Sequence, residues 1–319
     1  MMESFNGKKV LITGAVGFIG SHLAERLLIS NATVLGVDCL SDYYAVERKK
    51  QNLRVLSAHK NFQFRQADIC VDNLDDWMST ADYIFHLAAQ PGVRHSWGQS
   101  FDVYVNNNVL ATQKILESAV KNPQLKKFIY ASSSSIYGNV AAEDITEDQL
   151  PQPISPYGVT KLAGENLVYA YFKNYSLPAF SARFFTVYGP RQRPDMAFQK
   201  LIECALKKEP FVLYGDGTQQ RDFTFVEDVV ESLLRLTGTN QVGDAVNIGG
   251  GHVLSMNQIF ETLENLLGHK IELKKIAVQK GDVTRTNASI EKLQRLIGYA
   301  PSTPVAEGLA RQIKCTQMM

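Results

Sequence analysis

A glycine-rich turn near the N-terminus is the feature that most constrains the fold of this chain. The apolar run at residues 10–12 is followed by Gly14, Gly17 and Gly20, and helical apolar spacing begins at His22. Gly14 permits a tight turn, and Gly17 lets backbone N–H groups approach a pyrophosphate. Gly20 lets the helix pack closely on the strand. The pattern therefore predicts a strand, a phosphate-binding turn and a helix.

The next expected strand ends in an acidic residue. Residues 33–37 are mostly apolar and are followed by Asp38. In dinucleotide-binding folds an acid at this position binds the hydroxyl pair of the adenosine ribose, and its charge repels a 2′-phosphate. Together with the glycines, Asp38 predicts NAD rather than NADP as the cofactor. The alternative is that Asp38 only caps a turn.

Further strand patterns alternate with helical ones along the chain. Residues 62–67 alternate like a half-buried strand and are followed by Asp68 and Ile69, which we expect near the adenine ring. Residues 83–89 are almost entirely apolar, as is typical of a parallel strand that is covered on both faces. The alternation predicts an α/β fold with a Rossmann-type doubly wound parallel sheet.

A tyrosine and a lysine four residues apart are the first candidates for chemistry. Pro156 suits the first turn of a helix, and residues four apart share a helix face, so Tyr157 and Lys161 point to one pocket. A tyrosine has a pKa of about 10, and a nearby cation lowers it towards the range of a general base. A pKa lower by about three units requires roughly 4 kcal/mol of stabilisation of the phenolate. The alternative is a chance pair on a helix surface.

Two polar clusters interrupt the apolar pattern. Four serines, residues 132–135, follow an expected strand at residues 127–131, and open α/β sheets bind ligands at the carboxyl ends of their strands. Three asparagines, residues 106–108, lie in an otherwise helical segment, where asparagine is unfavourable. We expect Asn108 to brace the sheet near the nicotinamide, and a solvated helix face is the alternative.

Composition excludes several classes of partner. The 319 residues, 45% of them hydrophobic, suffice for a large core and two lobes. Lys plus Arg number 33 and Asp plus Glu number 32, so the charge balance predicts neither nucleic-acid nor membrane binding. The N-terminus shows no leader pattern, and the four cysteines and six histidines show no ligand spacing. We expect a cytoplasmic protein without a metal.

Six motifs occur in order along the chain and carry a family resemblance. They are residues 13–20, Asp38, the His-Leu-Ala-Ala of residues 86–89, the serine-rich strand end, the Tyr157 and Lys161 pair, and residues 183–190. On these motifs the sequence resembles the extended short-chain dehydrogenase/reductase family, specifically the NAD-dependent nucleotide-sugar 4-epimerases. The resemblance covers nearly the whole chain. It is greatest to the UDP-glucuronate 4-epimerases.

The resemblance implies roles for individual residues. Tyr157 would be the base, Lys161 would bind the nicotinamide ribose and acidify Tyr157, and Ser133 would hydrogen-bond the sugar. A tightly held NAD would be bound by Gly14, Gly17, Phe18, Ile19, Gly20, Asp38, Asp68, Ile69, Leu87, Ala88, Ala89, Asn108, Tyr157 and Lys161. Residues 1–178 would form the NAD-binding domain with the catalytic residues. Residues 179–319 would form mainly a smaller α/β lobe for the nucleotide sugar, with chain crossings between the lobes.

The serine-rich strand end separates branches of the family. Nucleotide-sugar 4,6-dehydratases carry Asp-Glu where this chain has Ser134 and Ser135, because they need an acid and a base for elimination. A serine at its ordinary pKa cannot do that proton transfer. The chemistry should therefore stop at oxidation and re-reduction of C4.

The residues that would select the sugar are less specific. By resemblance, Ser134, Ser135 and Thr186 face the sugar, and neutral hydroxyls of this kind suit the carboxylate of UDP-glucuronate. UDP-glucose and UDP-N-acetylglucosamine are alternatives, since the small Thr286 would admit an N-acetyl group. The remaining candidates are Tyr214 against the pyrimidine, Arg221 or Arg193 on the diphosphate, and Asp282 on the uridine ribose. Either arginine could instead form an internal ion pair.

The remaining expectations concern a dimer interface on two helices and two alternative functions. The helices near residues 102–121 and 156–174 carry more apolar residues than one sheet face requires, which by resemblance implies a homodimer; burial within one chain is the alternative. A nucleotide-sugar reductase and a non-catalytic nucleotide-sensing protein are the other functions. Asp38 and the absence of an obvious second substrate site argue against the reductase. Retention of both Tyr157 and Lys161 argues against the sensing protein.

Overall fold

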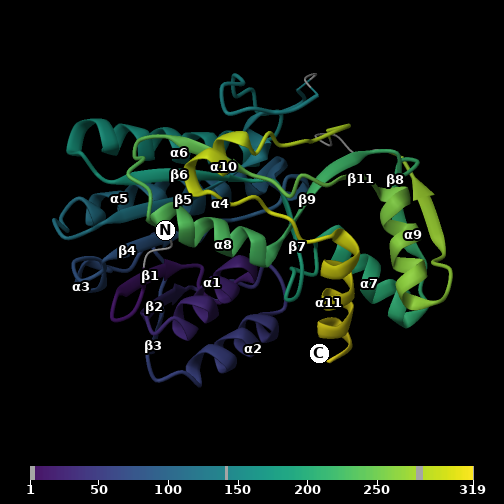
Figure 1. Ribbon diagram of the computed structural model, residues 1–319, viewed down its shortest axis with the longest axis horizontal. Helices are drawn as coiled ribbons and strands as arrows, with labels where there is room; N and C mark the ends of the chain where they lie inside the picture. The colour runs from purple at the N-terminus through teal and green to yellow at the C-terminus, as the bar shows by residue number, and fades with distance from the viewer. Residues whose placement is uncertain (1–3, 141–142, 278–282, 319) are drawn as a thin grey trace.

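A seven-stranded parallel sheet forms the centre of the molecule (Figure 1). The computed structural model describes residues 4–140, 143–277 and 283–318. The strand order is β10-β6-β5-β4-β1-β2-β3, and all neighbouring strands run parallel. The strands are β1 (Lys9–Thr13), β2 (Thr33–Asp38), β3 (Phe62–Gln66), β4 (Tyr83–His86), β5 (Lys127–Ser133), β6 (Ala179–Phe184) and β10 (Ala245–Ile248). The predicted α/β fold with a Rossmann-type doubly wound sheet is confirmed.

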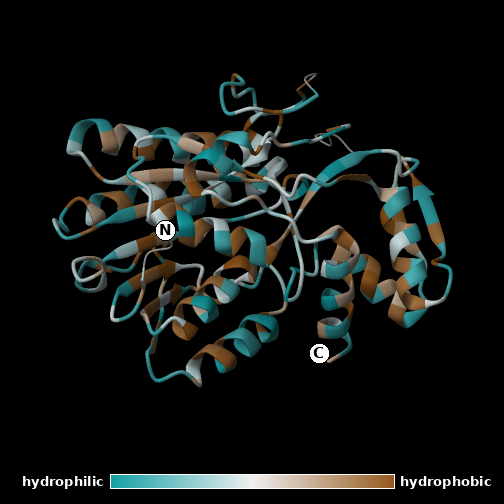
Figure 2. Cartoon of the chain, viewed as in Figure 1, coloured by the Kyte–Doolittle hydropathy of each residue, from teal (hydrophilic) through white to brown (hydrophobic). Residues whose placement is uncertain are grey.

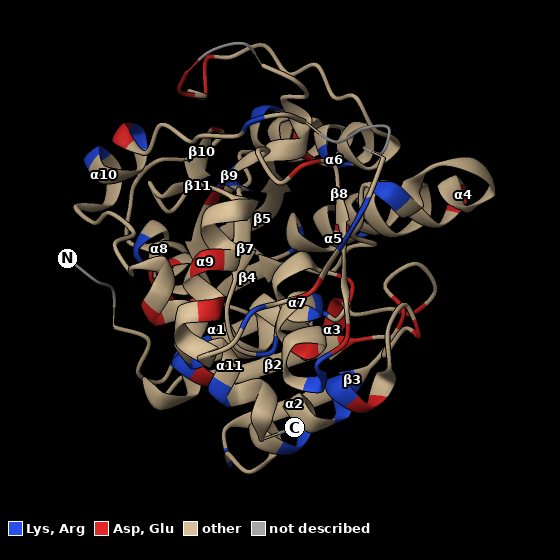
Figure 3. Cartoon of the chain, turned by 90° about the vertical axis from the view of Figure 1, so that its right-hand side faces the viewer, with Lys and Arg blue, Asp and Glu red and all other residues tan. Residues whose placement is uncertain are grey.

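Helices cover both faces of this sheet because successive strand residues point to opposite sides. Val10 and Ile12 of β1 belong to the same apolar cluster as residues of α1 (Phe18–Ile29), α2 (Val46–Ser57) and α8 (Val226–Thr237), whereas Leu11 packs with α3 (Asp75–Met78), α5 (Ala111–Ala119) and α6 (Pro156–Tyr175). Figure 2 shows hydrophobic residues along the strands and mixed residues on the covering helices. Basic and acidic residues are interspersed in the view of Figure 3.

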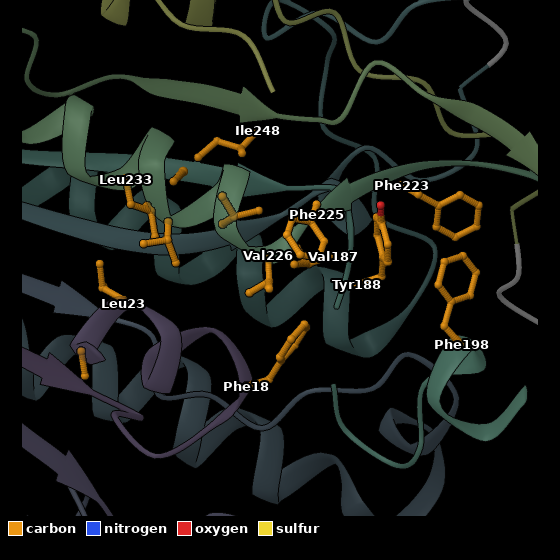
Figure 4. Packing of buried hydrophobic residues seen from close by; sticks show 14 of the residues in the cluster. Phe18, Leu23, Val187, Tyr188, Phe198, Phe223, Phe225, Val226, Leu233 and Ile248 are labelled. Carbon is orange, nitrogen blue, oxygen red and sulfur yellow. The ribbon is translucent and has the colours of Figure 1, made fainter. Parts of the chain in front are cut away.

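A smaller lobe is built on two short sheets beside the main one (Figure 1). One has the order β11-β9-β7 and the other pairs β12 with β8. Its elements are β7 (Thr186–Tyr188), α7 (Ala197–Lys207), β8 (Phe211–Tyr214), β9 (Gln220–Phe225), β11 (Val253–Ser255), α9 (Met256–Leu267), β12 (Leu273–Ile276) and α11 (Val305–Gln317). An aromatic cluster joins them: the Phe198 ring centre lies 5.3 Å from that of Tyr188 and 4.5 Å from that of Phe223 (Figure 4). The helix α10 (Glu291–Ile297) instead packs against β10 and α8, beside the main sheet (Figure 1).

Two boundaries differ from the sequence-based expectations. The strand expected at residues 83–89 ends at His86. The helix expected at 102–121 consists of α4 (Phe101–Tyr104), a π-helical segment at Val105–Leu110, and α5. The three asparagines lie in the π-helical segment, where wider turns loosen the regular i to i−4 hydrogen bonding. Among the described residues, none of the helices has the length and hydrophobicity that a membrane span requires.

Candidate active site

A cavity of about 210 Å³ opens at the carboxyl ends of the central strands. It lies where the strand order reverses between β4 and β1, which is the position of ligand sites in doubly wound sheets. Of the residues predicted to bind the cofactor, it is lined by Gly14, Gly17, Phe18, Ile19, Gly20, Asp38, Leu87, Ala88, Ala89, Tyr157 and Lys161. Asp68, Ile69 and Asn108 do not line it. Asp68 instead accepts a hydrogen bond from the backbone N–H of Cys70, at 2.8 Å.

The glycine turn leaves backbone exposed on one wall of this cavity. Gly14 has φ +69°, and a Cβ atom there would lie 2.9 Å from the backbone nitrogen of Ala88. A Cβ atom on Gly20 would lie 2.1 Å from the carbonyl oxygen of Gly14. Side chains are therefore excluded at both positions, and α1 begins beside the turn at Phe18. A wall of open backbone at a helix N-terminus fits the pyrophosphate of a dinucleotide.

Asp38 is buried at the end of β2 and has two donors within the chain. Its Oδ1 atom accepts from the backbone N–H of Leu40 at 2.8 Å and from Nζ of Lys49 at 3.2 Å. Lys49 lies on α2 and is itself buried and lines the cavity. Lys49 is not among the residues predicted from the sequence, since one lysine in a strongly charged helix carries no distinguishing signal.

A chain of hydrogen bonds under the cavity fixes the tautomer of the buried His86. Thr112 Oγ1 donates its proton to the Asn108 carbonyl oxygen at 2.7 Å, so it accepts from His86 Nε2 at 3.1 Å. His86 Nδ1 then accepts from Thr13 Oγ1 at 2.7 Å, and Thr13 Oγ1 accepts from the Ala88 N–H at 3.1 Å. Burial lowers the pKa of His86 to about 3, with a smaller contribution from the charge of Lys161. His86 is therefore a neutral core residue. Through Thr13 it fixes the position of the Ala88 backbone in the cavity wall.

Asn108 connects that wall to the helix that carries Tyr157. Its side-chain oxygen accepts from the Gln90 N–H at 2.7 Å, and its nitrogen donates to the Gln90 carbonyl at 3.1 Å and to Thr160 Oγ1 at 3.0 Å. Thr160 Oγ1 in turn donates to the carbonyl oxygen of Tyr157 at 2.8 Å. The expected bracing role of Asn108 therefore has a geometric basis, although the residue acts from behind the cavity wall.

Tyr157 and Lys161 lie on α6, as their spacing predicts. Ser155 caps this helix by accepting from the Gly158 N–H at 3.1 Å, and Pro156 occupies its first turn. Both Tyr157 and Lys161 line the cavity. Ser133, from the end of β5, lies close enough to Tyr157 for its side chain to favour the phenolate. The structure thus brings the three predicted catalytic residues together.

The charge state of these groups differs from the expectation in one respect. Burial raises the pKa of Tyr157, while the Ser133 side chain and the charge of Arg193 act in the opposite direction. Burial therefore acts against the lowering of the Tyr157 pKa that the sequence predicts from Lys161. Burial lowers the pKa of Lys161 itself to about 7, although the negative charge of Glu165 acts to raise it. Arg193 is a cation near Tyr157 whose charge favours the phenolate.

A second cavity of about 200 Å³ collects the residues predicted to face the sugar. Ser134, Ser135, Thr186, Arg221 and Thr286 all line it, although they come from four separate parts of the chain. Arg221 donates to the carbonyl oxygen of Val283 at 2.6 Å and thereby ties β9 to the segment at residues 283–286. Asp282 lies outside the described residues.

A third cavity, of about 920 Å³, lies between the sheet and the smaller lobe. Tyr214 lines it, and the guanidinium carbon of Arg94 lies 4.0 Å from the centre of the Tyr214 ring. Arg193 lines both this cavity and the first one. It forms two hydrogen bonds with Asp195, at 2.9 and 3.0 Å. Arg193 therefore forms the internal ion pair that was the alternative to ligand binding. It also lines both cavities. The sequence analysis missed Arg94.

Comparisons with known proteins find whole-chain similarities. Residues 10–249 match a family described as the NAD dependent epimerase/dehydratase family. A UDP-glucuronate 4-epimerase of Thermodesulfobacterium geofontis (strain OPF15) is 38% identical over 309 residues, which cover 95% of this chain and 94% of that protein. A protein of Bacillus subtilis (strain 168) named as an uncharacterized UDP-glucose epimerase is 40% identical over 307 residues, with 96% of each chain covered.

A solved structure gives the same result for the fold. The UDP-glucuronic acid 4-epimerase from Bacillus cereus, in complex with UDP-glucuronic acid and NAD, matches with a TM-score of 0.94 and 41% sequence identity. The match covers 97% of this chain and 99% of that one.

Proposed function

This chain belongs to the NAD-dependent epimerase/dehydratase family, and from that premise we propose that it epimerises a UDP-sugar at C4 through a 4-keto intermediate. The substrate that we favour is UDP-glucuronate, which would be converted to UDP-galacturonate. One observation carries the proposal: Tyr157, on the wall of the first cavity, lies close to Ser133. Ser133 directly precedes Ser134 and Ser135, which line the second cavity with Thr186 and with no carboxylate among the described residues.

NAD is the cofactor of this proposal. The open backbone at Gly14 and Gly20 fits its pyrophosphate, and Asp38 lies where the adenosine ribose would be held. NAD, when bound, supplies a hydride acceptor for C4 and returns the hydride in the same turnover. No external reductant is needed, which distinguishes the proposal from a nucleotide-sugar reductase.

The residues around C4 have separate tasks. Tyr157 as phenolate takes the proton of the O4 hydroxyl and later returns it, and Ser133 holds O4 through its hydroxyl. Arg193 favours the phenolate by its charge. Lys161, on the same helix, binds the nicotinamide ribose. Neither Ser134 nor Ser135 is an acid or base near neutral pH, so elimination of the C6 substituent does not follow.

The choice of sugar rests on the second cavity. Hydroxyl donors can bind a carboxylate without burying another charge, and a hydrogen bond to an ionised group is worth roughly 1.5 to 3 kcal/mol. The Bacillus cereus enzyme, whose fold this chain shares, was solved with UDP-glucuronic acid. UDP-glucose and UDP-N-acetylglucosamine remain the alternatives, the latter because Thr286 is small and lines the same cavity.

The remaining parts of the proposal concern assembly and context. Residues 1–178 would hold NAD and residues 179–319 mainly the nucleotide sugar, through Tyr214, Arg221 and Asp282. Exposed apolar residues on the two helical segments, Val103, Val105, Leu110, Val159 and Tyr169, support a homodimer. Leu116 and Tyr171, two other apolar residues of these helical segments, are buried within one chain. We propose a cytoplasmic enzyme of polysaccharide biosynthesis.

The test is NMR of the purified protein incubated separately with UDP-glucuronate, UDP-glucose and UDP-N-acetylglucosamine, without added reductant. The galacto-configured product should appear from UDP-glucuronate. A product from only one of the other sugars would correct the substrate. No product from any of them, with NAD bound, would overturn the proposal.

A further inference from the structure

The adenosine side of the first cavity contains a buried cation next to the buried carboxylate. Lys49 is 6% exposed and Asp38 is 7% exposed. Lys49 Nζ lies 3.2 Å from Asp38 Oδ1 and 3.1 Å from Ser41 Oγ. All three residues line the cavity. A ligand at Asp38 is therefore also beside an ammonium group and a hydroxyl.

The two oxygens of Asp38 have different surroundings. Oδ1 accepts from both Leu40 N–H and Lys49 Nζ. Within residues 4–140, 143–277 and 283–318, no group donates a hydrogen bond to Oδ2. The donors to Oδ1 fix the orientation of the carboxylate, which leaves Oδ2 to accept from a hydroxyl of the ligand. Lys49 is thus a positioning residue for the acid that is expected to bind the ribose.

The same pair has opposite effects on a 2′-phosphate. The Asp38 carboxylate repels it, whereas Lys49 attracts it and Ser41 offers a further hydrogen bond. While both charges are present, they largely cancel. If only the carboxylate is removed, Lys49 becomes a buried charge without its partner, which is a costly arrangement that a bound anion would relieve. The Tyr44 ring, whose centre lies 5.4 Å from Nζ, packs beside the ammonium group.

We propose that Lys49 is a cofactor-selecting residue: paired with Asp38 it orients the carboxylate for the ribose of NAD, and without that carboxylate it anchors the 2′-phosphate of NADP. The inference rests on the proposed function, because it takes the first cavity to be the NAD site. It adds a second selecting residue to Asp38. On this proposal, the preference for NAD over NADP depends on the balance between the buried charges of Asp38 and Lys49.

The test is a competition for binding, independent of turnover. The full-length protein is incubated with equal concentrations of NAD and NADP and passed through a desalting column, and the bound nucleotides are released and quantified by chromatography. The variants are D38N, K49M, D38N/K49M and the matched control D38N/K50M. Lys50 is the neighbouring lysine on α2, and its side chain is 50% exposed and paired with Glu47. Circular dichroism and melting temperature establish that each variant is folded.

The expected pattern separates the two residues. Wild type binds NAD; D38N shifts the bound NADP to NAD ratio towards NADP by about tenfold or more, the size expected for a charge-assisted contact. D38N/K49M loses this shift towards NADP, whereas D38N/K50M keeps it. K49M alone binds less NAD than wild type and does not bind more NADP. Equal NADP binding by folded D38N and D38N/K49M would overturn the proposal, as would a D38N variant that gains no NADP. If folded wild type binds neither nucleotide, the proposed function fails instead.

Discussion

Glu165 and Arg183 form a buried ion pair one helical turn beyond Lys161, with Arg183 Nε 3.1 Å from each carboxylate oxygen of Glu165. Ser132 Oγ also donates to Glu165, at 2.7 Å, directly before Ser133 in the chain. The pair therefore joins α6, the end of β5 and β6 at the place where the candidate catalytic residues meet.

The first prediction concerns the stability that depends on this pair. Arg183→Met leaves the Glu165 carboxylate buried without its main partner, so we expect a loss of about 3–5 kcal/mol in the free energy of unfolding. The control is Arg295→Met, in an ion pair with Glu291 whose side chains are 72% and 82% exposed; its loss should stay below about 1 kcal/mol. Urea unfolding followed by circular dichroism measures both. Equal losses of unfolding free energy would show that the buried pair stabilises the fold no more than the exposed pair does.

The second prediction concerns Tyr157. Tyr157→Phe removes the hydroxyl that transfers the O4 proton, and we expect turnover to fall by about 10²- to 10⁴-fold while bound NAD is retained. Tyr175→Phe, on an exposed residue of the same helix, should have no effect. Product formation is followed by NMR, and bound NAD by its release on denaturation. A Y157F variant as active as Y175F would remove Tyr157 from the mechanism.

The third prediction uses the pKa of Lys161. Burial lowers this pKa to about 7, so above that pH the unfolded chain binds a proton that the folded chain has lost. Stability should therefore rise with pH from about 7 towards the unfolded pKa near 10.4. Between about pH 7 and pH 9 the wild type should gain roughly 2 kcal/mol relative to Lys161→Met. Urea unfolding of the nucleotide-free proteins at each pH checks this, and parallel pH profiles would contradict it.

The fourth prediction is the tautomer of His86. The hydrogen-bond directions place the proton on Nε2, and burial holds the pKa at about 3, so the ring should stay neutral from about pH 8 to about pH 5. A ¹⁵N–¹H correlation spectrum should show an unprotonated Nδ1 throughout. Thr112→Val removes the acceptor for Nε2–H and should shift that proton signal. A doubly protonated ring in this range would contradict the assignment.

Local signals predicted those parts of the fold that depend on neighbouring residues. Pro156 and the residue before it define the start of α6, and the glycine turn defines the first strand and helix, because capping and backbone sterics act over a few residues. Spacing alone also placed Tyr157 and Lys161 on one face. The serine-rich strand end marked Ser133, Ser134 and Ser135 as candidates, and the family resemblance supplied their roles and the other residues of the second cavity.

The features that the sequence did not predict depend on long-range packing. Lys49 matters because α2 packs its fourth residue against the end of β2, and no local pattern marks one lysine among several. Arg193 was predicted for the diphosphate, but its place on a wall shared by two cavities comes from the arrangement of the two lobes. The direction of the pKa of Tyr157 depends on burial, which outweighs the charges that the sequence pairs with it.

The central sheet takes β6 and β10 from the half of the chain that also builds the smaller lobe. A chain cut after residue 178 would leave β5 as an open edge, with Phe128 and Ile129 lacking the neighbours that β6 provides. The two halves are therefore not interchangeable modules. Any hybrid of related enzymes made by joining halves must therefore rebuild the pairing of β5 with β6 across the junction, whereas single replacements at strand ends leave the sheet intact.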